Sequence, residues 1–183
     1  MFFINPFIYA GGGDFESIAT VTVGAGGAAN IEFASIPSTF QHLQIRLVGR
    51  MDKSATSVTN FYLTFNSDTT TNNSNHILYG DGSSAAAYGA ASLSVPDIGM
   101  ASGASASSSV FGASVIDILD YANTSKNTTS RSFTGLDLNG SGTVRLYSAA
   151  WLSTSAVTSV KLYRNDSNWV QHTTAALYGV KAP

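Results

Sequence analysis

Apolar and polar residues alternate along much of this chain, and a period of two residues is typical of β-strands with one buried face. In residues 42–50, Leu43, Ile45 and Leu47 face one way, and the residues between them face the other. Residues 61–65 repeat the pattern with Phe, Leu and Phe at alternate positions. Both segments are therefore predicted to be half-buried strands.

About nine or ten strands are expected, because turn signals rich in Gly, Asn and Ser separate such segments. Residues 110–121 are apolar on both faces, which indicates a central strand covered on both sides. A short helix is the alternative there, since Ile116, Leu119 and Asp120 also fit a 3.6-residue period. The expected strands are 17–23, 30–34, 42–50, 61–65, 76–79, 110–121, 130–138, 144–152, 157–163 and 169–180.

These elements predict an all-β fold, namely an antiparallel two-sheet sandwich that is jelly-roll-like and carries an extended N-terminal peptide. No repeat of roughly 20–50 residues is visible, which disfavours a propeller or a solenoid. The polar residues 66–75 are expected to form a surface loop. Residues 83–109 are rich in Ala, Ser and Gly, and a long loop or an irregular edge is expected for them.

The first residues are expected to form a separate segment, in which residues 1–13 are an apolar docking peptide with a glycine hinge and residues 14–183 are a single β-sandwich domain. Asn5 and Pro6 interrupt the apolar run, so neither a signal peptide nor a membrane span is expected. We expect the peptide to bind a neighbouring subunit, and folding back on its own sandwich is the alternative. The residues expected to bind the partner are Phe2, Phe3, Ile4, Pro6, Phe7, Ile8 and Tyr9.

Composition narrows the classes of function. The chain has 183 residues, a formal net charge of −2 and scattered basic residues, so nucleic-acid binding is not expected. Charged residues make up 11% of the chain, against a usual value of about 25%, and a weakly charged surface favours association with other subunits. There is no cysteine, which excludes disulfides, thiol catalysis and Cys-ligated zinc.

Residue patterns typical of enzymes are missing from the sequence. It has no Gly-x-Ser-x-Gly pentapeptide, the signature of a serine hydrolase. His42, His76 and His172 lie far apart in the sequence, so a metal site is not favoured, and His42 and His172 are interpreted as outward-facing strand residues. Asp117 and Asp120 would face opposite sides of a strand, which argues against a glycosidase pair. No catalytic, cofactor-binding or metal-binding residues are therefore expected.

Two further features are candidate binding sites. The loop at 66–75 offers oxygen ligands for calcium but lacks the Asp-x-Asp-x-Asp-Gly pattern, so a solvated hairpin tip is favoured. Tyr88, Trp151 and Trp169 could stack on sugar rings. Trp151 is expected in the core, whereas Trp169 follows the turn at 164–168 and is the better candidate for an exposed contact.

Several strings of the sequence resemble a largely uncharacterised group of small virion proteins from tailed bacteriophages of aquatic bacteria, including cyanophage-like ones. The resemblance spans about residues 14–181, and it implies a component of the phage particle without supplying catalytic residues. The strings are FESIATVTVG (15–24), SIPSTFQHLQIR (35–46), YGDG (79–82), IDILDYANT (116–124) and LYGVK (177–181).

The resemblance implies a structural protein that is assembled into the virion in the bacterial cytoplasm, and no enzymatic activity is expected. A homotrimer is expected by analogy with other small phage β-sandwiches. The favoured position is on the head, as a cement or decoration protein whose N-terminal peptide binds the major capsid protein or another virion protein. The alternative is a tail-fibre or receptor-binding protein whose polar loops contact a host surface glycan. Neither nucleic acid nor membrane is expected as a partner.

Overall fold

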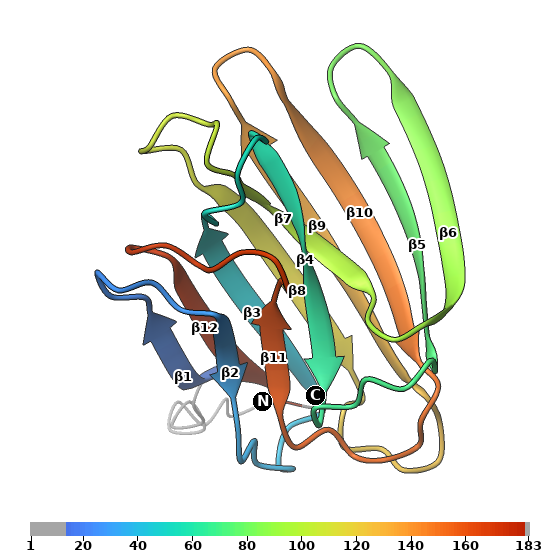
Figure 1. Ribbon diagram of the computed structural model, residues 1–183. Helices are drawn as coiled ribbons and strands as arrows, with labels where there is room; N and C mark the ends of the chain where they lie inside the picture. Colours follow the sequence, from blue (N-terminus) through green and yellow to red (C-terminus); the bar gives the residue numbers. More distant parts are fainter. Residues whose placement is uncertain (1–13, 182–183) are drawn as a thin grey trace, which may run out of the picture.

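The alternating pattern folds into twelve strands, and the computed structural model describes residues 14–181 (Figure 1). No helix occurs in these residues, so the helical alternative for 110–121 is wrong. The strands are β1 (Phe15–Thr22), β2 (Asn30–Phe33), β3 (His42–Gly49), β4 (Val58–Phe65), β5 (Asn73–Gly80), β6 (Ala85–Leu93), β7 (Asp97–Ser102), β8 (Gly112–Leu119), β9 (Thr128–Asp137), β10 (Gly142–Trp151), β11 (Val160–Tyr163) and β12 (Thr174–Val180).

The strands form two antiparallel sheets that pack as a sandwich, which confirms the expected fold class. The long sheet has eight strands in the order β1-β12-β3-β8-β9-β10-β5-β6, and the short sheet has four in the order β2-β11-β4-β7. The chain passes repeatedly from one sheet to the other, as in a jelly roll. Strand β8 lies near the centre of the long sheet, as the sequence predicts.

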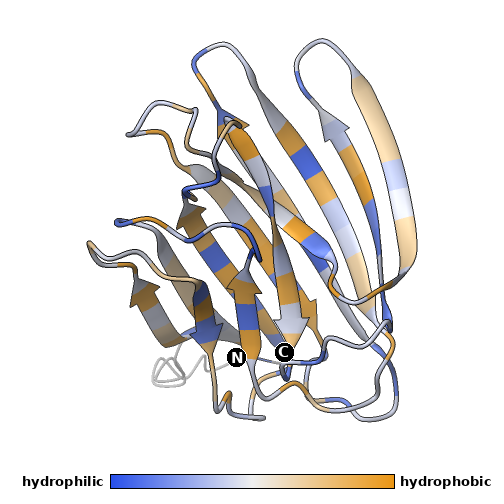
Figure 2. Ribbon diagram, viewed as in Figure 1, coloured by the Kyte–Doolittle hydropathy of each residue, from blue (hydrophilic) through white to orange (hydrophobic). Residues whose placement is uncertain are grey.

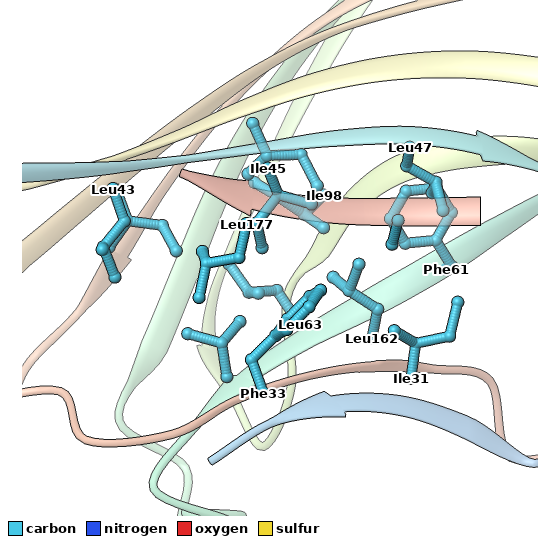
Figure 3. Close-up of a cluster of buried hydrophobic side chains, with 14 of the residues drawn as sticks. Ile31, Phe33, Leu43, Ile45, Leu47, Phe61, Leu63, Ile98, Leu162 and Leu177 are labelled. Atoms are coloured by element: carbon cyan, nitrogen blue, oxygen red, sulfur yellow. The ribbon is translucent and has the colours of Figure 1, made fainter. Parts of the chain in front are cut away.

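Apolar side chains from the facing sides of both sheets fill the core. Figure 2 shows apolar and polar positions alternating along the long strands, as expected for strands with one buried face. The core side chains of Figure 3 come from strands of both sheets and are at most 4% exposed. They include Ile31, Phe33, Leu43, Ile45, Leu47, Phe61, Leu63, Ile98, Leu162 and Leu177.

Trp169 belongs to this core, so the expectation of an exposed contact there is wrong. Its side chain is completely buried, packs edge-on against Phe61 at 5.3 Å between ring centroids, and donates from Nε1 to the carbonyl of Leu162 at 3.0 Å. After the turn, its backbone pairs with that of Ala28 and turns the indole inward. Trp151 is also buried, at 4% exposure, as expected.

Residues 83–109 are more regular than the sequence predicts, because strands β6 and β7 lie within them. Along β6, eight of nine residues are exposed, so neither face is selected to be apolar. The Ala, Ser and Gly residues of β6 show no alternation of apolar and polar positions, although β6 pairs with β5 along its length. The prediction of a long loop is therefore wrong for this part of the segment.

The rest of that segment, after β7, is held by a buried arginine. Arg50 is 7% exposed. Its guanidinium donates to the carbonyls of Ser107 and Val110 from one nitrogen, and to those of Ala104 and Ala106 from the other, at 2.8–3.3 Å. Arg50, which directly follows β3, thus fixes the path of a loop that has few large residues of its own.

Candidate assembly surface

A row of apolar side chains crosses the outer face of the long sheet, away from the short sheet. Val115 of β8 pairs with Phe133 of β9, which pairs with Leu146 of β10 and then with Leu78 of β5. These four side chains are 40–53% exposed. Because paired residues point to the same side of a sheet, they lie next to one another on one face.

A second row runs beside the first and widens it. Val48 pairs with Ala113, Ala113 with Gly135, and Gly135 with Val144, so two exposed valines flank small residues. Val48 and Val144 are each 51% exposed. We call the six large residues of the two rows the apolar band: Val48, Leu78, Val115, Phe133, Val144 and Leu146.

The band arises because β9 has the reverse of the usual polarity. Its inward positions hold hydroxyl side chains, including Ser130, Ser132 and Thr134, which are at most 4% exposed, while Phe133 points outward. Ser132 donates to the carbonyl of Ile98, and Thr134 shares a 2.8 Å hydrogen bond with a serine hydroxyl of β8. Hydrogen bonding thus compensates the buried hydroxyls, and the register places the large apolar ring in solvent.

The expectation that the strand at 110–121 is covered on both sides is met on one face only. Ile116 and Ile118 are completely buried, whereas Val115, which points to the other face of β8, is 40% exposed. Contiguous apolar surface of this kind on a soluble protein typically marks a site of interaction with another protein.

Two shallow hollows lie within the outer face, one on each side of Leu78 and Leu146. The first has a volume of about 340 Å³ and is lined also by Phe133 and Val144. The second has a volume of about 440 Å³ and is lined also by His76. Hollows beside projecting apolar side chains allow such side chains of a partner to be buried.

An ion pair lies at one end of the band, and two carboxylates lie at the other. At one end Arg131, whose side chain is 67% exposed, donates to Asp117 at 3.1 Å. At the other end Asp81 and Asp137 stand at the tips of the β5–β6 and β9–β10 hairpins, and both are exposed. Backbone N–H groups of the first of these turns, beginning with that of Ser83, hold the pKa of the Asp81 carboxyl well below its usual range, so it is anionic.

The other sequence candidates do not converge on a catalytic or metal centre. Within residues 14–181 no three His, Asp or Glu side chains are placed to share a metal ion. Asp117 pairs with Arg131, whereas Asp120 lies beside Lys126 and His42, so the two aspartates serve separate ion pairs. The residues from Phe2 to Tyr9 lie outside the described residues, and their docking role stays a prediction.

The loop at 66–75 is an organised turn built on Asp68. Its carboxylate accepts hydrogen bonds from the hydroxyl and backbone N–H of Thr70, from the amide of Asn72 and from the indole of Trp151, at 2.7–2.9 Å. These bonds, led by that from the Thr70 hydroxyl, hold the pKa of Asp68 well below its usual range. Both carboxylate oxygens are thus used by protein donors. The expectation of a hairpin tip is wrong, because this segment joins β4 of the short sheet to β5 of the long sheet and its residues 73–75 belong to β5.

Comparison with known proteins adds no family to this description. No protein-family model matches the chain, and no curated protein matches it. Residues 14–181 also contain no helix with the length and hydrophobicity that crossing a bilayer requires.

Proposed function

We propose that this chain is a structural subunit of a tailed-bacteriophage particle and that its apolar band packs against the band of a second copy. The reversed polarity of β9 is the observation that supports self-association most directly. Shifting β9 by one residue would bury Phe133 together with the charged Arg131 and Asp137, and it would expose Leu136. The present register is therefore the favoured one, and it leaves the Phe133 ring in water unless a partner covers it.

The free energy available from covering the band is substantial. A fully buried Val, Leu or Phe contributes roughly 1.5–3 kcal/mol, and the six side chains are already about half buried, so each would contribute about 1 kcal/mol more. Two copies would double that sum before the cost of association is subtracted. Sheets that pack face to face lie about 10 Å apart, which suits interdigitation of such side chains.

The charges at the ends of the band favour a second copy as the partner. Along the outer face of β9, Arg131 precedes Phe133 and Asp137 follows it, roughly 20 Å from the arginine at about 3.4 Å per residue. A twofold axis between the two faces and across β9 brings the Arg131 guanidinium of each copy, which also pairs with Asp117 of its own chain, towards the Asp137 carboxylate of the other. Such an isologous contact is self-complementary.

The assembly in which this contact operates is proposed from the resemblance to virion proteins of tailed phages. We place the subunit on the head as a cement or decoration protein, where residues 2–9 bind the capsid lattice. Repeated weak contacts to a lattice gain strength through high effective concentration. The homotrimer expected by analogy with other small phage β-sandwiches stays a prediction, and the twofold contact described above would instead give a pair.

Sedimentation equilibrium of the full chain and of Leu146→Lys tests the contact. Leu146 is 50% exposed at the centre of the band, so a lysine there should be harmless to the fold and should shift the mass to that of a monomer. The matched control is Leu152→Lys, since Leu152 is 55% exposed but lies outside the band, and this variant should associate like the parent. If the parent is a trimer and only Leu146→Lys dissociates, the apolar band would still be the interface, but the twofold arrangement would be wrong.

A parent chain that is monomeric at every concentration tested, or equal association of the two variants, would refute the contact. The position on the particle is tested separately by immunogold labelling of intact phage. Label over the heads supports a cement or decoration protein, and label confined to the tail tip supports the receptor-binding alternative. Absence of label from every particle would refute the virion proposal.

A further inference from the structure

A second surface lies on the opposite face of the long sheet, where β10, β5 and β6 extend past the short sheet (Figure 1). On this inner face Arg145 of β10 pairs with Tyr79 of β5, which pairs with Ala86 of β6. Strand β6 is exposed at nearly every position, so the short sheet does not cover it.

Two tyrosine rings and an arginine are stacked there. The guanidinium carbon of Arg145 lies 4.7 Å from the centroid of the Tyr79 ring, and the Tyr88 ring meets that of Tyr79 edge-on at 6.5 Å. Tyr88 is 44% exposed. The stacking fixes the orientation of the planar arginine and leaves a large part of one aromatic ring accessible.

The short sheet adds an amide and a carboxylate to this group. Asn60 of β4 donates from Nδ2 to Asp97 of β7 at 2.8 Å, and its Oδ1 accepts from Arg145 at 3.5 Å. Burial raises the pKa of Asp97, and burial together with the Asp97 charge raises the pKa of Tyr88. We call these five residues the Tyr–Arg cluster: Asn60, Tyr79, Tyr88, Asp97 and Arg145.

Hydrogen-bonding capacity is left unused under the cluster. Oδ1 of Asn75, which is 4% exposed, has no hydrogen-bond partner among the described residues. The hydroxyl of Tyr147, which is 2% exposed, makes no hydrogen bond of good geometry, although the Arg145 side chain lies within reach of it. Tyr147 lies between Asn75 and Arg145 in the pairing of β10 with β5, and the charges of Arg145 and Asp97 both act on its phenol. Unpaired buried polar atoms are uncommon in folded proteins and call for an explanation such as a bound polar molecule.

We infer that the Tyr–Arg cluster binds a carbohydrate. A sugar ring offers an apolar C–H face, which suits the exposed ring of Tyr88, and hydroxyls that both donate and accept. Carboxylate, guanidinium and amide groups supply planar partners for such hydroxyls. Arg145 and Asp97 carry opposite charges, which favours a polyhydroxylated ligand over a simple anion or cation.

A proline-rich peptide also docks on aromatic rings, but it would place few donors against the Asp97 carboxylate and the unpaired acceptor of Asn75. The site goes beyond the proposed assembly function, because it lies on the face of the long sheet opposite to the apolar band. It would therefore stay open when two copies associate through their bands, and it would give a particle component a means of attaching to glycans.

Saturation-transfer-difference NMR on the full chain tests this inference. The probes are the methyl glycosides of glucose, galactose, mannose, rhamnose and glucuronic acid, with poly-L-proline as the competing class. At least one sugar should receive saturation at its C–H protons. Loss of one stacking ring in Tyr88→Ala should weaken that sugar's affinity by about three- to tenfold.

The matched control is Tyr178→Ala, because Tyr178 also has an arginine, Arg46, near its ring at 5.3 Å but lies on the outer face of β12. The control should bind the sugar like the parent. Saturation that falls equally in both variants, saturation of no sugar, or saturation of poly-L-proline alone would overturn the inference. None of these results depends on association through the apolar band, which sedimentation measures independently.

Discussion

Replacing Arg50 by Met removes the guanidinium that holds residues 103–110 while keeping much of the side-chain volume. Four backbone carbonyls lose their donor. A hydrogen bond from a charged donor contributes about 1.5–3 kcal/mol, which gives a gross loss near 6–12 kcal/mol for the four. Burying the charge costs several kcal/mol in the parent, and the exposed residues Ala104 and Ser107 can rebond to water in the variant. We therefore expect a net loss of about 2–4 kcal/mol in the free energy of unfolding.

Urea unfolding at one fixed protein concentration measures this loss, because association would otherwise add to the apparent stability. Amide exchange gives the local counterpart. The N–H groups of Gly103, Ala104 and Ser105 donate to carbonyls of residues 53–57, and they should exchange faster when the loop is released. Lys126→Met, which removes a cation that is 56% exposed, should cost at most about 1 kcal/mol. Equal losses in the two variants, with unchanged exchange in 103–110, would refute the role given to Arg50.

Two further substitutions test packing and titration. A Cβ on Gly99 would lie 2.3 Å from the ring of Phe61, which is completely buried and cannot move away. Gly99→Ala should therefore lower the free energy of unfolding in urea by about 1–3 kcal/mol. Gly24→Ala is the control and should be close to neutral, because nothing lies within 4 Å of its added Cβ; equal losses in the two variants would contradict the packing argument. The pKa of Asp68 is lower in the folded chain than the usual value of 3.8 for an aspartate, so its contribution to stability is complete above that value and is lost as the pH falls through the folded pKa. Melting temperatures of Asp68→Ala should therefore vary less than those of the parent between about pH 5 and pH 2, and parallel curves would contradict this.

Strands with one face in the core were predictable from the sequence, and strands without that constraint were not. In β3 and β4 the core selects large apolar side chains at alternate positions, and the selection appears directly as a period of two. In β6 neither face is buried by the short sheet, so Ala, Ser and Gly satisfy the pairing and no period remains. Trp169 was misplaced because a turn signal fixes where the chain reverses but not which way the next side chain points.

Part of the apolar band is visible in the sequence of β9. Residues 130–134 read Ser, Arg, Ser, Phe, Thr, and the regular hydroxyl positions on one face already opposed Phe133 on the other. The alternation of residues along a strand does not show which of its two faces meets the core. The face with the larger apolar residue is usually expected to be buried. Only the pairing of β9 with β8 and β10, whose buried positions are established, shows that Phe133 points outward.

The pairing of β1 with β12 has a consequence for how the chain is made. Phe15 pairs with Val180 and Thr22 with Thr174, so the partners are far apart in the sequence. Strand β2 likewise pairs with the distant strand β11. A ribosome that has released only the first hundred residues has therefore produced strands whose neighbours do not yet exist. Such non-local pairing folds slowly and leaves strand edges exposed meanwhile. The β1 edge of the long sheet can form only after residues 174–180 have been synthesised, so its formation limits how soon a new copy becomes competent to associate.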